Sequence, residues 1–295
     1  MQLADIHIRD PFILLDEDVY YLYGTTVFWG NADNFICYRS KDLKDWVGPV
    51  EIFRRSEDFW ADRCFWAPEC HKYGGRFYFM ATMGSEQRKK GIQLLVSDRP
   101  DQTFTPVGQG PVTPASMTCI DGTLYEENGV PYLIFSHSFE DGGESAMCAV
   151  PMKADLSGTD GDIFTLFYTK EAPWAKPFPN GREEFSMDQD VYFSDGPYLH
   201  RTGDGTLLML WSSWGGQGYT VGTAASVDGT LHGTWRQYEE PLLEGVGGHG
   251  MIFSDTHGKT YYIIHSPNDI SKERPYLYEL IEKGGRVVLK EAQFQ

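Results

Sequence analysis

Five short segments of the chain place a carboxylate or an imidazole among residues that favour tight turns. They are Arg9-Asp10-Pro11-Phe12, Trp66-Ala67-Pro68-Glu69, Ile120-Asp121-Gly122-Thr123, Ser194-Asp195-Gly196-Pro197 and Gly247-Gly248-His249-Gly250. Carboxylates and imidazoles are common general acids and bases in enzymes. If the fold brings the five segments together, their side chains form one cluster that can exchange protons, with Asp10, Glu69, Asp121, Asp195 and His249 as its members.

Each segment precedes a run of aromatic and β-branched residues, a composition that favours β-strands. The five predicted strands cover residues 19–24, 76–81, 131–136, 207–212 and 259–265. Positions 10, 67, 121, 195 and 249 of the preceding segments lie 57, 54, 74 and 54 residues apart. This quasi-period is longer than the roughly 40 to 50 residues of common propeller repeats, and it indicates blades with extended loops.

Tight turns such as Tyr73-Gly74-Gly75 and Gly203-Asp204-Gly205 suit hairpins between the first two strands of each repeat. Third strands are expected at 35–39, 91–96 and 219–224. We therefore predict an all-β fold, a single domain over residues 1–295 that forms a five-bladed β-propeller of four-stranded antiparallel blades around a central channel. A β-sandwich or β-helix would not place a polar segment at the start of each long repeat.

In a propeller, the first strands of all blades lie side by side around the channel. The five polar segments would then meet at one mouth of that channel, although they are far apart in the sequence. This mouth is the predicted functional site.

Composition limits the partners. Acidic residues outnumber basic ones 42 to 25, for a net charge of −17, which repels nucleic acid and anionic membranes. The five cysteines show no metal-binding spacing and are expected to be buried thiols. No apolar run is long enough for a membrane helix. The first residues show no signal-peptide pattern, so the chain as written is expected to be cytoplasmic, or secreted or periplasmic if a signal peptide was removed.

The same five segments resemble glycoside hydrolase family 43 in order and spacing, over positions 9 to 278. The segment Tyr38-Arg39-Ser40-Lys41-Asp42-Leu43-Lys44-Asp45-Trp46 and the segment His265-Ser266-Pro267-Asn268 are also similar to that family. The resemblance implies an inverting hydrolase with three essential carboxylates. It implies Asp10 as the general base and Asp121 as the residue that tunes the pKa of the acid and orients it.

The general acid of the family is usually a Glu in a Glu-Gly-Pro context, and here that context is Asp195-Gly196-Pro197. An aspartate is one methylene shorter, which places the proton donor farther from the glycosidic oxygen unless the backbone or the sugar moves inward. Asp195 is the predicted acid. Glu183, Glu184 and Glu144, on long loops of blades three and four, are the alternatives.

Further residues are expected to bind the sugar. Trp29, Phe65, Trp66 and Trp214 are candidates for stacking on sugar faces or for packing between blades. Glu69 is either a hydrogen-bonding group of the pocket or a structural one, and Arg274 either binds a sugar hydroxyl, neutralises the carboxylates or forms a surface ion pair. His249 is a candidate for packing, for substrate binding or for metal ligation.

No cofactor is expected to be required for the chemistry. The resemblance implies a hydrated calcium ion near His249 in the channel, with a structural or electrostatic role only.

The leading functional hypothesis is an exo-acting hydrolase that releases α-L-arabinofuranose or β-D-xylose from plant-type glycans, with the loops at 138–146 and 171–190 as walls of a pocket. An endo-acting arabinanase or xylanase of the same fold is the alternative. A sugar-binding propeller without catalysis is the third hypothesis, because fold alone does not establish activity. The preferred sugar, the linkage and the oligomeric state do not follow from the sequence.

Overall fold

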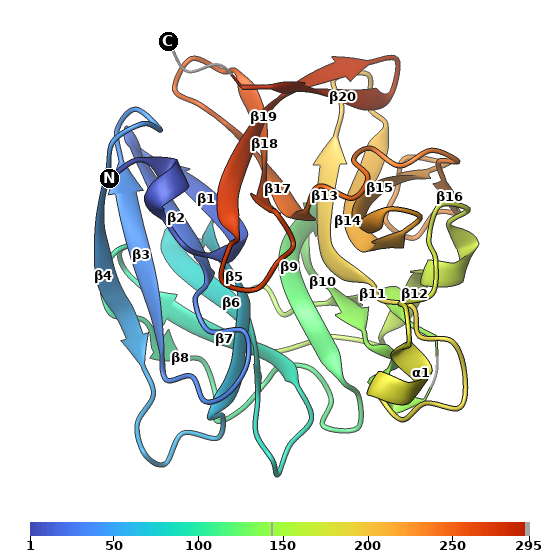
Figure 1. Ribbon diagram of the computed structural model, residues 1–295. Coiled ribbons are helices and arrows are strands. Elements are labelled where there is room, and N and C mark those ends of the chain that lie inside the picture. The colour runs from blue at the N-terminus through green and yellow to red at the C-terminus, as the bar shows by residue number, and fades with distance from the viewer. Residues whose placement is uncertain (143, 293–295) are drawn as a thin grey trace.

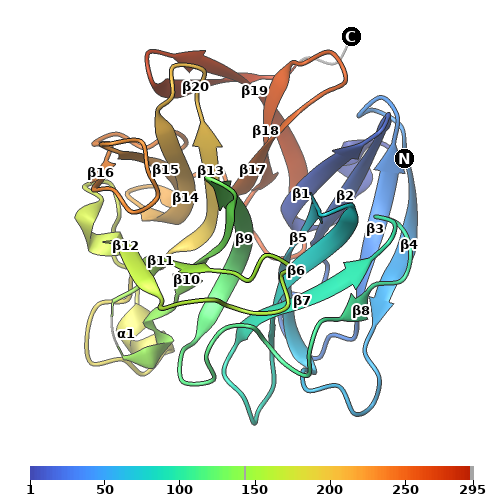
Figure 2. The same cartoon turned by 180° about the vertical axis from the view of Figure 1, so that it is seen from behind.

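The predicted strands form because their aromatic and β-branched side chains can be buried between stacked sheets. The computed structural model of the protein describes residues 1–142 and 144–292. Within them the chain forms five four-stranded antiparallel sheets arranged in a ring, as Figures 1 and 2 show from opposite sides. The predicted five-bladed β-propeller is confirmed.

Each blade is a meander in which consecutive strands are hydrogen-bonded neighbours. Blade one holds β1 (Arg9–Asp16), β2 (Val19–Thr25), β3 (Asn34–Ser40) and β4 (Trp46–Arg54). Blade two holds β5 (Arg63–Tyr73), β6 (Arg76–Gly84), β7 (Gly91–Ser97) and β8 (Thr105–Pro106). Blade three holds β9 (Cys119–Glu127), β10 (Val130–His137), β11 (Ala146–Pro151) and β12 (Phe164–Tyr168).

Blade four holds β13 (Asp195–Arg201), β14 (Leu207–Gly215), β15 (Gly218–Ser226) and β16 (Trp235–Gln237). Blade five holds β17 (Gly248–Ser254), β18 (Thr260–Ser266), β19 (Arg274–Lys283) and β20 (Arg286–Glu291). The short helices are η1 (Leu3–Asp5), η2 (Phe139–Asp141), η3 (Thr169–Glu171) and α1 (Gly181–Glu184). None of the helices in this described part of the chain has the length and hydrophobicity that a membrane crossing requires.

The hydrophobic core lies between neighbouring blades rather than in one central mass. One cluster of buried side chains joins blades five, one and two, and three further clusters join blades two and three, three and four, and four and five. Four of the five cysteines are buried in these layers and Cys64 is half-buried, and all five are free thiols. Burial raises the pKa of the Cys70 thiol to about 12, which is the behaviour of an inert packing residue.

The first strand of every blade has a residue in the left-handed conformation near its start. The φ values are 51°, 46°, 57°, 52° and 49° at Asp10, Ala67, Asp121, Gly196 and His249. The pairing of each first strand with its second strand shifts register at this point, as expected of a β-bulge. Gly196, not Asp195, is therefore the blade-four equivalent of Asp10, which corrects the repeat positions assigned from the sequence.

The backbone N–H of the left-handed residue is bonded to a side chain of the preceding blade. The N–H groups of Ala67, Asp121 and His249 donate to the hydroxyls of Thr25, Thr82 and Ser212, each at 2.8 Å. The ring closes where the Asp10 N–H donates to Nδ1 of His265, at 3.2 Å. Buried N–H groups need such partners, so one polar side chain per blade sets the position of the next blade.

The step from blade three to blade four differs. Ser136 of β10 bonds instead to the hydroxyl of Ser194, and the Gly196 N–H donates to Oδ2 of Asp121 at 3.1 Å. A carboxylate thus replaces the hydroxyl at this one step.

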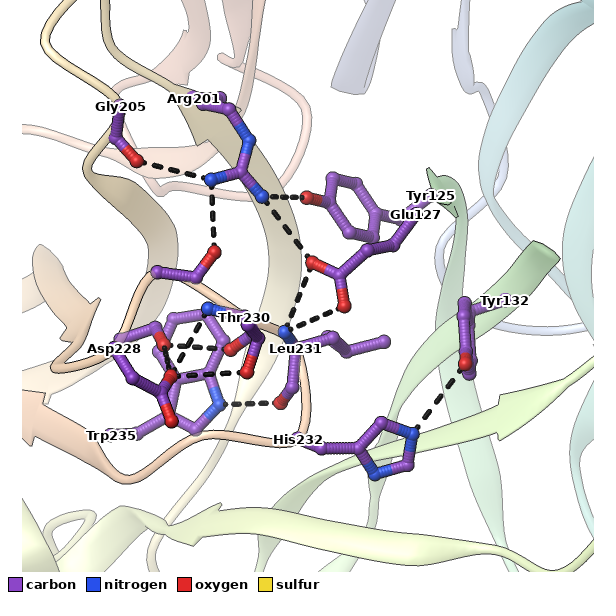
Figure 3. Close-up of polar contacts among 12 residues, drawn as sticks. Tyr125, Glu127, Tyr132, Arg201, Gly205, Asp228, Thr230, Leu231, His232 and Trp235 are labelled. Atoms are coloured by element: carbon purple, nitrogen blue, oxygen red, sulfur yellow. Dashed lines mark hydrogen bonds and ion pairs between the residues drawn. The ribbon is translucent and has the colours of Figure 1, made fainter. Parts of the chain in front are cut away.

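The blades are also joined at the opposite end of the inner strands. Figure 3 shows Arg201, at the end of β13, bonded to the Tyr125 hydroxyl and the Glu127 carboxylate at the end of β9. Glu127 also accepts from the backbone N–H of Leu231. These bonds hold blades three and four together at the mouth far from the carboxylates.

We expect Thr82→Val to destabilise the protein, because it leaves the buried Asp121 N–H without an acceptor. The free energy of unfolding should fall by about 1 to 3 kcal/mol. Urea denaturation measures this, with Thr82→Ser as the control because serine keeps the hydroxyl. Equal losses in the two variants would contradict the role of this hydrogen bond.

Candidate active site

Three carboxylates and one imidazole meet where the inner strands begin. Nδ1 of His249 lies 3.3 Å from Oδ1 of Asp10 and 3.7 Å from Oδ2 of Asp121. A Cβ added to Gly196 would lie 2.7 Å from the His249 ring, so only a glycine lets the residue after Asp195 pass this close. The structure therefore brings Asp10, Asp121, Asp195 and His249 together from four blades.

Asp10 is 6% exposed and is held by two neighbours. Its Oδ2 accepts from the Thr25 hydroxyl at 2.6 Å, and its N–H bonds to His265. Burial favours the neutral carboxyl, but the charges of His249 and Arg9 outweigh burial and hold its pKa well below the usual range. Asp10 is therefore the carboxyl group of the cluster that gives up its proton most readily.

The pKa of Asp121 is shifted in the opposite direction to that of Asp10. Burial raises its pKa to about 7 against the attraction of His249, and the charges of Asp195 and Asp10 add to the rise. Its Oδ2 accepts from the backbone N–H of Gly196, next to Asp195. Asp121 thus fixes the position of the strand that carries Asp195.

Asp195 is the first residue of β13, and its Oδ2 accepts from the Tyr219 hydroxyl at 3.0 Å. Burial, with the charge of Asp10 in support, raises its pKa against the opposing effects of His249 and Tyr219. A buried carboxyl with a raised pKa holds its proton at the pH where Asp10 has lost its own. The cluster therefore contains both a proton acceptor and a proton donor.

His249 provides the compensating positive charge. Burial lowers its pKa, but the negative charges of Asp10, Asp121 and Asp195 outweigh burial and raise it. An imidazolium among three carboxylates reduces the cost of burying them.

The residues around His249 do not fit direct ligation of calcium. Calcium takes six to eight oxygen ligands, and Nδ1 of His249 faces carboxylates. In the described part of the chain, no group of three or more His, Cys, Asp or Glu has metal-binding geometry. Calcium in the channel stays a prediction, and no chemical step is assigned to it.

The sequence reasoning missed His265, which is fully buried. Its Nδ1 accepts from the Asp10 N–H, and its Nε2 bonds to Oδ1 of Asn268 at 3.1 Å. These two bonds define a neutral ring protonated at Nε2, and burial lowers the pKa of His265 accordingly. The sequence did contain a pattern that points to His265. Each second strand has a polar residue opposite the residue that precedes the left-handed one, and these are Thr25, Thr82, Ser136, Ser212 and His265.

Arg9 is the cation beside the carboxylates, although the prediction named Arg274. The Arg9 guanidinium bonds to Glu273 at 2.7 Å and lies 4.3 Å above the Phe28 ring. Arg274 instead donates to the backbone oxygen of Ala4 and contacts the ring of His7. It joins blade five to the N-terminal segment, and the structure does not bring it to the carboxylates.

The predicted aromatic residues separate into two groups. Trp66 stacks on Phe28, and Trp29, which is 62% exposed, contacts both rings edge-on. This aromatic platform of Phe28, Trp29 and Trp66 continues from Arg9. Phe65 is 2% exposed and packs against Phe35 and Phe53, so it is a core residue rather than a stacking surface.

Trp214 belongs to an aromatic wall on blades three and four. The wall consists of Phe139, Phe178, Phe185, Phe193 and Trp214, whose rings contact one another at 4.8 to 6.0 Å. It joins the loop after β10 to the long loop before β13.

One of the remaining predicted residues also acts on the cluster. Glu69 is buried on the inner strand of blade two, where its carboxylate accepts from His71 at 2.8 Å, and its negative charge contributes to the raised pKa of His249. His71 lines a cavity of about 430 Å³ formed by the inner strands. Glu183 and Glu184 are exposed on α1, and Glu144 pairs with Lys170 at the surface.

Buried carboxyl groups whose pKa values are shifted in opposite directions thus lie together at one mouth of the propeller. The family model for Glycosyl hydrolases family 43 matches residues 4–288. The chain belongs to this family and is a glycoside hydrolase. The resemblance found in the sequence is confirmed.

Solved structures of similar proteins have the same fold. An endo-arabinase from Bacteroides thetaiotaomicron is 34% identical, with a TM-score of 0.89 over 97% of this chain and 98% of that chain. An endo-1,4-beta-xylanase from the same organism is 25% identical, with a TM-score of 0.75 over 97% and 95%. An alpha-L-arabinofuranosidase from Lactobacillus brevis, at 16% identity and a TM-score of 0.73 over 96% and 95%, shares the fold. No protein with a curated description matches the chain.

The raised pKa of Asp121 predicts how stability depends on pH. The native carboxyl keeps its proton up to a pH of about 7, whereas the unfolded chain releases it near the ordinary aspartate pKa of 3.8. The contribution of Asp121 to stability is therefore complete below the unfolded pKa and is lost as the pH rises through the native one.

We expect Asp121→Asn to remove this loss, because an amide does not titrate. Urea unfolding of both proteins from pH 4 to pH 8 should show the wild type losing stability relative to the variant as the pH rises. Parallel stability curves would contradict the raised pKa.

Proposed function

We propose that the protein releases terminal pentose, α-L-arabinofuranose or β-D-xylose, from plant-type glycans by an inverting acid–base mechanism. The observation that carries this proposal is the placement of Asp10 and Asp195 in one buried cluster with His249, where Thr25 holds one oxygen of Asp10, Tyr219 holds one oxygen of Asp195, and the two pKa values are shifted in opposite directions. Inverting hydrolysis requires one ionised and one protonated carboxyl on opposite faces of the sugar.

In the proposed step, Asp10 accepts a proton from water while the water oxygen bonds to the anomeric carbon. Asp195 gives its proton to the glycosidic oxygen as the bond between that oxygen and the anomeric carbon breaks. One water is consumed, and the configuration at the anomeric carbon inverts. The Thr25 hydroxyl orients the base, since it occupies Oδ2 of Asp10.

Asp121 is proposed to orient the acid and to tune its proton affinity. Its bond to the Gly196 N–H fixes the backbone beside Asp195. A buried carboxyl of like charge near a second one disfavours ionisation of both, which keeps the acid protonated near neutral pH.

The aromatic wall supports exo action, because it packs together the two loops that were predicted to close a pocket. Endo action on arabinan is the second candidate. It is supported by the 34% identity, over nearly the full length of both chains, to a protein described as an endo-arabinase.

Variants of the two carboxylates test the mechanism. We expect Asp10→Asn to lower turnover of aryl α-L-arabinofuranoside or aryl β-D-xyloside by about 10² to 10⁴-fold, because no other group activates the water. Asp195→Asn should lose comparable activity on glycans but retain it on a dinitrophenyl glycoside, whose leaving group needs no proton. NMR of the first product should show the inverted anomer.

The matched control is Asp98→Asn, since Asp98 is 84% exposed and pairs with Arg76 at the far end of blade two. Equal activity of Asp195→Asn and wild type on glycans would assign the acid role to another residue. An inert wild type would favour the sugar-binding propeller without catalysis.

Product size separates the two modes of action. With linear arabinan or xylan, exo action should release monosaccharide from the first minutes while viscosity stays high. Endo action should give mixed oligosaccharides and a rapid fall in viscosity. Chromatography of early products together with viscometry decides between them.

A further inference from the structure

The side chain of Asp195 is one methylene shorter than that of glutamate. Its carboxyl group must therefore be held in a defined position if it is to act as the acid. The structure provides one contact of this kind. The hydroxyl of Tyr219, from the third strand of the same blade, donates to Oδ2 of Asp195 at 3.0 Å. Oδ1 is left as the oxygen that can carry the proton.

The side chain of Tyr219 is itself fixed by its neighbours. It is 6% exposed, and its ring stacks on the His265 ring with centroids 5.6 Å apart and planes 17° apart. On another side lies Gly248, where an added Cβ would come within 2.8 Å of the tyrosine ring. The hydroxyl therefore has a fixed position, which is what a group needs to orient another side chain.

The stacked rings of Tyr219 and His265 also connect to Asp10, the proposed base. His265 accepts from the Asp10 N–H and is fixed in turn by Asn268. Two stacked rings thus connect Asp195 in blade four with Asp10 in blade one, and blade five supplies the ring between them. The separation of the acid and the base depends on this contact.

We propose that Tyr219 is a positioning residue for Asp195, holding Oδ2 so that Oδ1 presents its proton to the glycosidic oxygen. This inference rests on the proposed function.

The hydroxyl has a second effect during the reaction. When Oδ1 gives up its proton, the electrons of the O–H bond stay on Asp195 and the negative charge spreads to Oδ2. A hydrogen bond to a charged acceptor is stronger than one to a neutral acceptor. Tyr219 remains protonated throughout, because burial and the charges of Asp195 and Asp10 raise its pKa well above 10.

The test is Tyr219→Phe, which removes one oxygen and keeps the stacked ring. We expect turnover of a glycan substrate to fall on the order of 10-fold, with little change in KM. Activity on a dinitrophenyl glycoside should change little. The alkaline limit of kcat/KM should move to higher pH, because the acid loses a donor that favours its ionised form.

Tyr23→Phe is the matched control. Tyr23 is a buried tyrosine like Tyr219, and its hydroxyl donates to the backbone oxygen of Pro100, away from the carboxylates. This variant should lose some stability but keep the alkaline limit of the wild type. A carboxyl-carbon NMR titration of Asp195 in the wild type and in Tyr219→Phe gives the same comparison without turnover, and the pKa should rise in the variant.

The outcomes separate the two proposals. If wild type is inert, or if Asp195→Asn keeps full activity on glycans, the proposed function or its acid fails, and the role of Tyr219 fails with it. If both hold but Tyr219→Phe leaves the alkaline limit and the Asp195 titration unchanged, or loses activity equally on both substrates, the role of Tyr219 alone is overturned.

Discussion

One kind of buried hydrogen bond recurs between neighbouring blades and holds the ring together. Each inner strand has, near its start, a left-handed residue whose N–H is bonded to the neighbouring blade. The conformation is costly for any residue except glycine, on the order of 1 to 3 kcal/mol. It persists because the N–H would otherwise be buried without an acceptor. Two carboxylates and the histidine of the active site, Asp10, Asp121 and His249, occupy these positions, so the bond that assembles the ring also aims the reactive side chains.

Burying three carboxylates together is unfavourable unless positive charge lies among them. His249 and Arg9 supply that charge unequally. Asp10 is close to both and stays ionised, whereas burial dominates at Asp121 and Asp195 and keeps them inclined to hold protons. One cluster thus contains carboxyl groups of the same type in two protonation states. The difference arises from position alone, and it is the property that acid–base catalysis needs.

The ring closes without an exchanged strand, because blade one is entirely N-terminal and blade five entirely C-terminal (Figure 1). Side chains close it instead: Arg9 bonds to Glu273, Arg274 bonds to the backbone of Ala4, and His265 accepts from the Asp10 N–H. The proposed base therefore lies at the seam. A change in the contacts between blades five and one would therefore move the proposed base. The fully buried His265 takes part in those contacts and also holds Asp10.

The five blades could be predicted from the sequence, because strand composition and a repeated polar segment are local properties of the chain. The sequence also determined that Asp10, Asp121, Asp195 and His249 converge, since inner strands of a propeller share one mouth. The partners of those residues follow from the folded arrangement of the blades. Phe65 proved to be core and Arg274 a seam residue, whereas Arg9, Tyr219 and His265 reach the cluster. Such contacts join residues up to 270 positions apart, as Arg274 and Ala4 do, and they depend on angles between blades that no local pattern encodes.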